Sequence, residues 1–231
     1  SLVERRERLV QPGLVLARGI RGVRLQILDH APRSTGDVDG QHDLPPVPAR
    51  VIAPDERGKI EVDRATFRTK LPHIFAVGDV IGFPSLASTS MEQGRIAACN
   101  AFDAPAQAPP EFFPYGIYSV PEMSTIGMTE EQVRQKHIAY ECGIARFRET
   151  ARGQIMGLNA GFMKMIFARE TRRLLGVHIV GEGATELIHI GQAVLNLGGT
   201  LDYFVENTFN YPTLAAAYKI AALDAWNRIP R

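Results

Sequence analysis

The apolar positions of the chain fall into short runs separated by turn-forming residues. Residues 74–77 (IFAV) form a continuous apolar run, which is typical of a strand buried on both faces. Residues 140–147, 162–168 and 174–180 alternate or run apolar as strands do, and a charged turn joins the last two. Three strands so spaced predict an antiparallel sheet.

Helical periodicity marks five further segments. In the first of them Leu86, Met91 and Ile96 recur at helical spacing, and the second is preceded by Thr129 and Gln132 at the spacing of a capping box. The segment that starts at residue 183 is amphipathic and ends at a Gly-Gly pair. The predicted helices cover residues 85–102, 130–137, 183–199, 201–207 and 213–229.

Other stretches carry turn and linker signals. Residues 1–10 are charge-dense, residues 13–28 could hold a strand or two, and residues 30–48 are turn-formers without periodicity. We leave residues 1–48 unassigned as a poorly structured or aberrant N-terminal segment. β-prone pieces on either side of residues 54–58 predict a hairpin or meander. The proline-rich residues 105–114 cannot continue a helix and predict a linker between a first domain, residues 49–104, and a second, residues 115–231.

Composition narrows the class of partner. Lys and Arg number 26 against 25 Asp and Glu, so the net charge of +1 gives no field that would attract nucleic acid or an anionic membrane. No apolar run approaches the roughly 20 residues that span a bilayer. Cys99 and Cys142 fit no metal-ligand or disulfide spacing and are expected to be buried free thiols. These features predict a cytoplasmic protein with α/β architecture, no metal and no membrane or nucleic-acid partner.

One glycine-rich stretch comes close to a nucleotide-binding motif. Residues 181–186 (GEGATE) follow a predicted strand and open a predicted helix, but Glu186 replaces the third glycine of G-x-G-x-x-G. Glu182 would also place negative charge where a pyrophosphate should lie. We therefore interpret this stretch as a plain strand-to-helix turn, and no intact dinucleotide fingerprint occurs in the chain.

A stronger candidate site follows the first apolar strand. That strand delivers Gly78 and Asp79 to its carboxyl end, where open α/β sheets hold ligands. A carboxylate there can accept a hydrogen bond from a ribitol or ribose hydroxyl. The helix start near Ala87 and Ser88 would present backbone N–H groups to a negative ligand atom. From these residues alone, an Asp that caps a loop is the competing interpretation.

Several ordered motifs resemble the pyridine nucleotide-disulfide oxidoreductases. "HIFAVGDVIGFPSLASTSMEQGRIAA" resembles the C-terminal FAD-binding segment of that family, a part of a Rossmann-like domain. "YSVPEMSTIGMTEEQ", "RRLLGVHIVGEGATELIHIGQAV" and "FNYPTLAAAYKIAAL" resemble, in order, its C-terminal dimerisation domain. The resemblance covers about residues 49–231. It implies FAD as cofactor, a homodimer, Gly78 and Asp79 at the ribityl chain, and Ala87 and Ser88 at the flavin pyrimidine ring.

Among subfamilies, "VGDVIGFPSLAS" and "NTFNYPT" are most similar to the soluble pyridine nucleotide transhydrogenases, which pass hydride from NADPH to NAD through FAD. Thiol reductases of the family place a His-Pro pair and a later Glu where this chain has Tyr211-Pro212 and Ala216. A phenol with a pKa of about 10 is a poor base near neutral pH, and hydride exchange needs no such base. Tyr211 is then either a catalytic group that approaches from the partner subunit or an aromatic plug at the subunit boundary.

Residues 1–48 do not resemble the family's N-terminal half, which carries both Gly-rich nucleotide loops. We therefore expect a C-terminal portion of such an enzyme, with NAD(P) binding left to the full-length protein. The first alternative is a non-catalytic dimerisation module. The second is a disulfide reductase such as lipoamide dehydrogenase, which would need a closely spaced cysteine pair that Cys99 and Cys142 do not provide.

The remaining candidates have structural interpretations. His178 and His189 lie among apolar neighbours and are expected to be structural histidines. Tyr218 and Trp226 fit the core or the subunit interface better than a ligand site. Two groups of arginines are expected at solvated strand ends and turns, with contact to a nucleotide phosphate as the alternative: Arg146, Arg148 and Arg152, and Arg169, Arg172 and Arg173.

Overall fold

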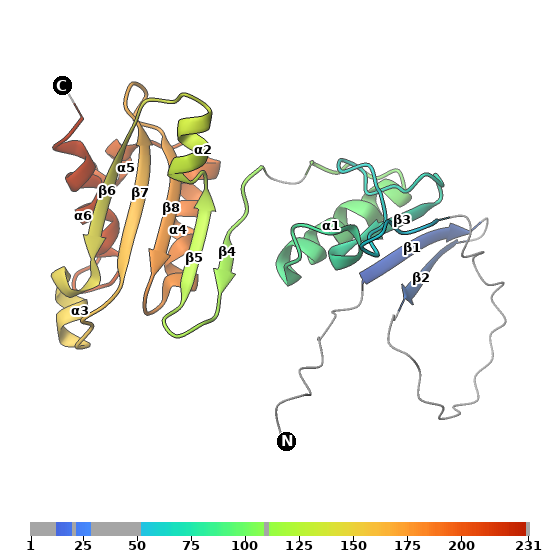
Figure 1. Ribbon diagram of the computed structural model, residues 1–231, viewed down its shortest axis with the longest axis horizontal. Helices are drawn as coiled ribbons and strands as arrows, with labels where there is room; N and C mark the ends of the chain where they lie inside the picture. The colour runs from blue at the N-terminus through green and yellow to red at the C-terminus, as the bar shows by residue number, and fades with distance from the viewer. Residues whose placement is uncertain (1–12, 20–21, 29–51, 109–110, 230–231) are drawn as a thin grey trace, which may run out of the picture. The chain divides into compact units, whose positions relative to one another are not determined.

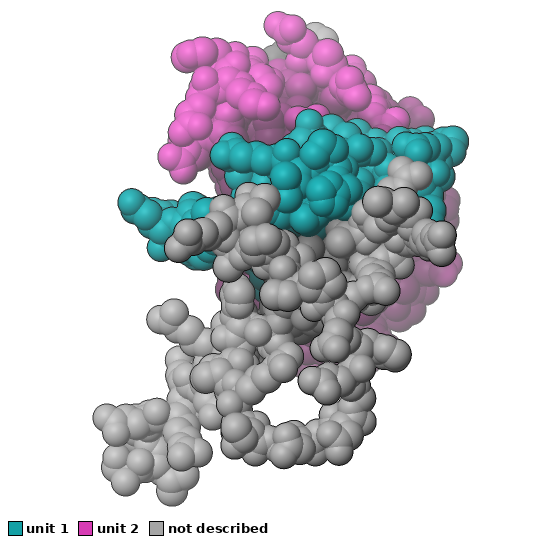
Figure 2. Space-filling view, turned by 90° about the vertical axis from the view of Figure 1, so that its right-hand side faces the viewer, with its two compact units in different colours: residues 1–110 teal, residues 111–231 magenta. Residues whose placement is uncertain are grey.

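The structure is a computed structural model that describes residues 13–19, 22–28, 52–108 and 111–229 (Figure 1). It divides into two compact units, residues 1–110 and residues 111–231, which Figure 2 shows in teal and magenta. Most of the predicted segment 1–48, and residues 109–110 of the predicted linker, lie outside the described residues. Each unit is considered by itself below.

The first unit packs one helix against a small sheet. Strand β1 (Gly13–Gly19) pairs antiparallel with β2 (Gly22–Leu28) and with β3 (Ile74–Val77). All four residues of β3 are buried, as the continuous apolar run predicts. A 3₁₀ helix, η1 (Gly78–Ile81), and helix α1 (Ala87–Ala101) follow it in the chain.

One residue that was expected on the buried face of α1 is exposed instead. Ile96 and Ala97 of α1 pack with Phe67, Phe75 and other buried residues. Met91, expected on the same face as Ile96, is 71% exposed. Residues five apart on an α-helix are rotated by about 140°, so Met91 cannot share that face.

The predicted hairpin around residues 54–58 is a turn without strands. The Asp55 carboxylate accepts hydrogen bonds from the N–H groups of Arg57 and Lys59, at 2.9 and 2.8 Å. This side chain takes two N–H groups that a hairpin ladder would use, and residues 54–58 form a turn with no flanking strands.

The second unit is built on a five-stranded antiparallel sheet, so the predicted fold class is confirmed. The sheet order is β4-β5-β8-β7-β6. Its strands are β4 (Tyr115–Ile117), β5 (Met123–Gly127), β6 (Tyr140–Arg146), β7 (Phe162–Ala168) and β8 (Leu174–Val180). The three predicted strands are β6, β7 and β8, and the short pair β4 and β5, joined across Pro121, extends the sheet beyond them.

Three helices cover one face of this sheet (Figure 1). They are α4 (Ala184–Asn196), α5 (Leu201–Glu206) and α6 (Ala216–Trp226). Helix α2 (Glu130–Gln135) starts at the predicted capping box of Thr129 and Gln132 and buries Val133 against Met128 and Ile166. A short 3₁₀ helix, η2 (Phe147–Glu149), and helix α3 (Ala151–Ile155) link β6 to β7.

Two close contacts hold the helical layer on the sheet. At Gly143 of β6 an added Cβ would lie 1.8 Å from the carbonyl oxygen of Ala221 in α6, so only glycine allows this approach. The fully buried Tyr218 of α6 donates its hydroxyl proton to the Leu187 carbonyl, at 2.8 Å, and accepts a hydrogen bond from Gly191 N–H, at 3.0 Å. Leu187 and Gly191 are a donor-acceptor pair of α4 four residues apart, and the phenol therefore ties α6 into the hydrogen-bond ladder of α4.

The edge strand β6 has carboxylates along its open side. The backbone N–H of Cys142 donates to Glu141 at 3.1 Å, that of Ile144 donates to Asp224 at 2.8 Å, and that of Arg146 donates to Glu149 at 3.2 Å. These three bonds, with acceptors from β6, α6 and η2, satisfy N–H groups that an edge strand otherwise leaves free.

Candidate functional site

The chain segment after β3 brings Gly78 and Asp79 to the end of a fully buried strand. Gly78 has a φ of +77°, a conformation that favours glycine, and its N–H donates to the side-chain oxygen of Gln93 in α1 at 2.7 Å. Gln93 is itself 5% exposed. Asp79 follows in the first turn of η1, and its side chain is half-buried. The buried bond from Gly78 to Gln93 fixes where this carboxylate leaves the strand.

The start of α1 is open to solvent. Its N-cap residue, Leu86, is extended, and no side chain caps the helix. The hydroxyls of Thr89 and Ser90 donate to the Leu86 carbonyl, at 2.9 and 2.8 Å, instead of accepting from helix N–H groups. Ala87 and Ser88 are exposed. The first turn of this 15-residue helix therefore offers backbone donors and a partial positive charge to a ligand.

This donor set fits two parts of a flavin nucleotide. A carboxylate beside a strand end can accept hydrogen bonds from the hydroxyls of a ribityl chain, and uncapped N–H groups suit the electron-rich edge of a pyrimidine ring. The strand beside β3 runs antiparallel to it, so Asp79 does not lie between parallel strands as the open-sheet argument assumed. The distance between the Asp79 carboxylate and the N–H groups of α1 is therefore set by the loop that joins Asp79 to Ala87.

Sequence reasoning missed two residues that hold this loop. Gln93 binds Gly78, and the guanidinium of Arg64 donates to the carbonyls of Ile81 and Phe83, at 2.9 and 3.1 Å. These contacts span between 15 and 19 residues of sequence. No periodic pattern links residues at such separations, and no signal in the sequence would have identified them.

Tyr211 lies in the second unit, on the loop between α5 and α6. Its side chain is 78% exposed. Ala216, at the position where thiol reductases carry a Glu, is the first residue of α6. A phenol so exposed is free to meet another molecule, and within its own unit it is not part of the core.

The histidines and the buried tyrosine have structural roles. Thr125 binds Nδ1 of His178, and Nε2 lies 3.2 Å from the Met128 carbonyl. Burial lowers the pKa of His178 below its usual 6.5, and the charge of Lys164 acts in the same direction. Tyr218 is a core residue stacked on Phe204, with ring centroids 5.3 Å apart. His189 is exposed and bonds to Gln192 at 2.8 Å.

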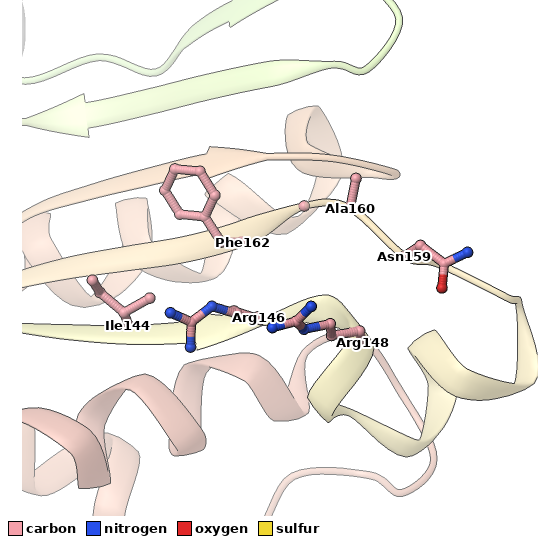
Figure 3. Close-up of a pocket in the computed structure, with 7 residues that line it drawn as sticks. Ile144, Arg146, Arg148, Asn159, Ala160 and Phe162 are labelled. Atoms are coloured by element: carbon pink, nitrogen blue, oxygen red, sulfur yellow. The ribbon is translucent and has the colours of Figure 1, made fainter.

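Two of the six arginines pair with side chains of the same unit. Arg172 donates to Asp202 at 2.8 Å and lies over the ring of Trp226. Arg146 donates to Glu149 at 3.2 Å. Figure 3 shows Arg146 and Arg148 beside Phe162 and Ile144, along an open hollow of about 380 Å³. The paired arginines support their interpretation as strand-end and turn residues.

The cysteines and the sequence 181–186 complete the list of candidates. Cys99 and Cys142 are free and partly buried, where full burial was expected, and burial raises the pKa of Cys142 to about 11. Strand β8 ends at Val180 and α4 begins at Ala184, so residues 181–186 are the predicted strand-to-helix turn. In the described part of the chain, no three His, Cys, Asp or Glu side chains gather as a metal site requires, and no helix has the length and apolar composition to cross a bilayer.

Comparison with known protein families identifies the second unit. Residues 113–222 match the dimerisation domain of the pyridine nucleotide-disulphide oxidoreductases. This match lies within the second unit and covers 110 of the 231 residues. The domain match spans the five-stranded sheet and all but the last turn of its helical layer.

The chain is also similar to named relatives over a longer stretch. It is 55% identical over 173 residues to a soluble pyridine nucleotide transhydrogenase of Mycobacterium bovis, covering 75% of this chain and 37% of that protein. It is 50% identical over 179 residues to the protein of the same name in Citrobacter koseri, covering 76% and 38%. The chain thus spans less than two fifths of the length of these curated relatives.

Solved structures agree on the fold. The HOCl-induced flavoprotein disulfide reductase RclA of Escherichia coli superposes with a TM-score of 0.70 at 25% identity, covering 74% of this chain and 40% of that one. LpdA of Mycobacterium tuberculosis gives a TM-score of 0.70 at 24% identity, covering 90% and 47%. The chain therefore has a fold similar to that of these solved proteins over much of its length.

Proposed function

We propose that this chain is the C-terminal part of an FAD-dependent oxidoreductase of the soluble pyridine nucleotide transhydrogenase type, which transfers hydride from NADPH to NAD. The observation that carries the proposal is the 55% identity over 173 residues to a protein of that name. That alignment is longer than the dimerisation domain, residues 113–222, so it includes residues outside this domain. The names of these relatives, and an alignment that extends beyond the dimerisation domain, support a transhydrogenase over other members of the family.

The residues of the first unit have defined roles in this proposal. Gly78 and Asp79 would hold the ribityl chain of FAD, with the Asp79 carboxylate as hydrogen-bond acceptor. Ala87 and Ser88 would direct the N–H groups of α1 at the pyrimidine edge. FAD supplies, when bound, the ability to take up and release a hydride, and the protein contributes position and electrostatics.

Tyr211 has a role at the boundary between two copies of the chain. Its 78% exposure leaves the phenol available to a partner subunit, which a homodimer of the dimerisation domain would provide. Hydride transfer between nicotinamides requires no thiol and no base at this position. We therefore assign Tyr211 to subunit contact, and a full-length enzyme with Tyr211→Phe that keeps wild-type turnover would support contact over catalysis.

A disulfide reductase is a weaker candidate. Such chemistry needs two neighbouring redox thiols, and Cys99 and Cys142 belong to different units. The high pKa of Cys142, about 11, also keeps its thiol protonated near neutral pH. Reduction of a disulfide substrate by the purified chain would overturn this choice.

A non-catalytic dimerisation module is the second candidate function. It is favoured by the absence of an intact G-x-G-x-x-G from the 231 residues, because this motif holds the pyrophosphate of FAD and of NAD(P) in such enzymes. In this case the domain would still pair with a second copy, but Asp79 and α1 would bind nothing.

Incubation with FAD separates the two candidates. The purified chain is mixed with excess FAD, passed through a desalting column and examined for flavin absorbance, and its mass is measured by light scattering. A mass twice the 25.4 kDa of one chain, with retained flavin, supports the enzyme. A dimer without flavin supports the module.

Two variants test whether Asp79 binds FAD. Asp79→Leu is expected to weaken FAD binding at least tenfold, since a charged hydrogen bond contributes about 1.5–3 kcal/mol. Asp55→Asn is the matched control, because Asp55 is an exposed carboxylate on a turn of the same unit. Equal losses of affinity in the two variants would contradict the assignment of Asp79.

A further inference from the structure

We propose that Arg64 is a positioning residue of the cofactor site, holding the loop that separates Asp79 from the start of α1. The role in FAD binding rests on the proposed function, whereas the role in holding the loop does not. Seven residues, 80–86, separate Asp79 from Ala87, and their path sets how far the carboxylate lies from the helix N–H groups.

The guanidinium of Arg64 binds two backbone carbonyls of this loop. Nη2 donates to the Ile81 carbonyl at 2.9 Å and Nη1 donates to the Phe83 carbonyl at 3.1 Å. Ile81 is the last residue of η1, so its carbonyl has no helical partner further along the chain. The planar fork of an arginine reaches both carbonyls at once, which the single ammonium of a lysine cannot do in the same geometry.

Gly82, which lies between the two carbonyls that Arg64 binds, is also closely packed. Its φ is +83°, and an added Cβ would lie 2.9 Å from Cδ of Lys59. The backbone N–H of Ile60 donates to the Val80 carbonyl at 2.8 Å. Residues 59–64 therefore run beside residues 80–83 and hold them at successive positions, although neither stretch forms a strand.

Arg64 is itself held in place by the turn that contains it. The Asp63 carboxylate accepts hydrogen bonds from the N–H groups of Ala65 and Thr66, at 2.8 and 2.9 Å. These bonds, with that from Thr66 the stronger, lower the pKa of Asp63, so the carboxylate stays ionised near neutral pH. Phe67 donates its N–H to the Asp63 carbonyl and is 2% exposed in the core of the unit. The turn is thus anchored to the core, and Arg64 extends from it to the loop.

The consequence concerns the spacing within the site. The buried bond from Gly78 to Gln93 fixes one end of the loop, and burial of Ile96 in the core fixes the body of α1. The first turn of α1, with Ala87 and Ser88, has neither kind of support. Thr89 of this turn donates its hydroxyl to the carbonyls of Pro84 and Leu86, at 3.2 and 2.9 Å, so the turn follows the loop. Arg64 holds that loop from a separate segment of the chain, and loss of its contact should separate the ribityl acceptor from the N–H donors.

Hydrogen exchange on the flavin-free chain tests whether Arg64 holds the loop. Arg64→Gln is compared with Arg57→Gln, which removes an equally exposed positive charge from the same unit. We expect amide exchange of residues 82–90 to be about five- to tenfold faster in Arg64→Gln and unchanged in Arg57→Gln. Arg64→Lys should exchange nearly as fast as Arg64→Gln. Unchanged exchange in Arg64→Gln would overturn the proposal.

A flavin titration of the same variants tests the link to the cofactor. Where the wild-type chain binds FAD, Arg64→Gln should bind it about tenfold more weakly, and the midpoint potential of the bound flavin should fall, because the positive helix end is no longer held at the pyrimidine edge. Faster exchange with unchanged affinity and potential would refute the link to the cofactor. A wild-type chain that binds no FAD would refute the proposed function, and the exchange result would still decide whether Arg64 holds the loop.

Discussion

The two units of this chain hold their shape in different ways. The second unit packs three helices on a five-stranded sheet, and its backbone groups are satisfied mainly by ladders and helices. In the first unit, residues 52–73 and 78–86 are held by side chains that bind backbone groups, among them Asp55, Asp63, Arg64 and Gln93. A sheet distributes its stability over many equivalent bonds, whereas such a loop depends on a few individual side chains.

The largest expected effect would break the second unit alone. Gly143→Ala puts a methyl group onto the backbone carbonyl of Ala221, which cannot move without displacing α6, and we expect a loss of at least about 3 kcal/mol. The fluorescence of Trp226, the only tryptophan of the chain, reports unfolding of this unit in urea. Gly94→Ala in α1 of the first unit, where an added Cβ meets nothing within 4 Å, is the control and should leave the Trp226 transition unchanged.

The next effect concerns the link between α4 and α6. Tyr218→Phe removes the hydroxyl that binds both the Leu187 carbonyl and Gly191 N–H in a fully buried site, so we expect a loss of about 1–3 kcal/mol in the urea unfolding of the second unit. Tyr203→Phe, at a 43% exposed ring, should cost almost nothing. Equal losses in the two variants would show that the buried bridge contributes no stability.

A third variant tests a buried hydrogen bond of the first unit by itself. Gln93→Met keeps the volume but leaves the buried N–H of Gly78 without its acceptor, which should cost about 1–2 kcal/mol. The loss should appear as faster exchange of the Gly78 amide, while Trp226 fluorescence in urea stays unchanged. A shifted Trp226 transition would mean that the two units do not respond separately.

The smallest expected effect is a dependence on pH in the second unit. Burial holds the pKa of His178 below 6.5 in the folded state, so the neutral ring contributes stability that is complete above about pH 6.5. This stability is lost as the pH falls from 6.5 through the folded pKa. The urea midpoint of the wild type should therefore drop more between pH 7.5 and 5.5 than that of His178→Gln. The same drop in both would exclude His178 as its cause.

The same contrast explains what the sequence could predict. The strands β3, β6, β7 and β8 and the helices α1, α2, α4, α5 and α6 follow from apolar runs, helical periods and caps. Strands β4 and β5 are three and five residues long, and Pro121 between them hid their pairing. The hairpin expected at residues 54–58 failed because the side chain of Asp55 takes the N–H groups that a strand would pair.

The candidate site was predictable only in part. Gly78, Asp79, Ala87 and Ser88 lie next to elements with clear periodic signals, so their positions could be assigned from the sequence. Arg64 is a surface arginine among many, and its role follows only when the fold brings it to carbonyls 17 and 19 residues away. Long-range contacts between a side chain and a loop leave no pattern in the sequence.

The carboxylates along β6 limit how two sheets of this family member can join. A second strand laid against this edge would have to displace Glu141, Asp224 and Glu149 from backbone N–H groups and leave their charges beside its own carbonyl oxygens. Such a contact is repulsive as long as the carboxylates are ionised. A continuous ten-stranded sheet through two β6 strands is therefore disfavoured.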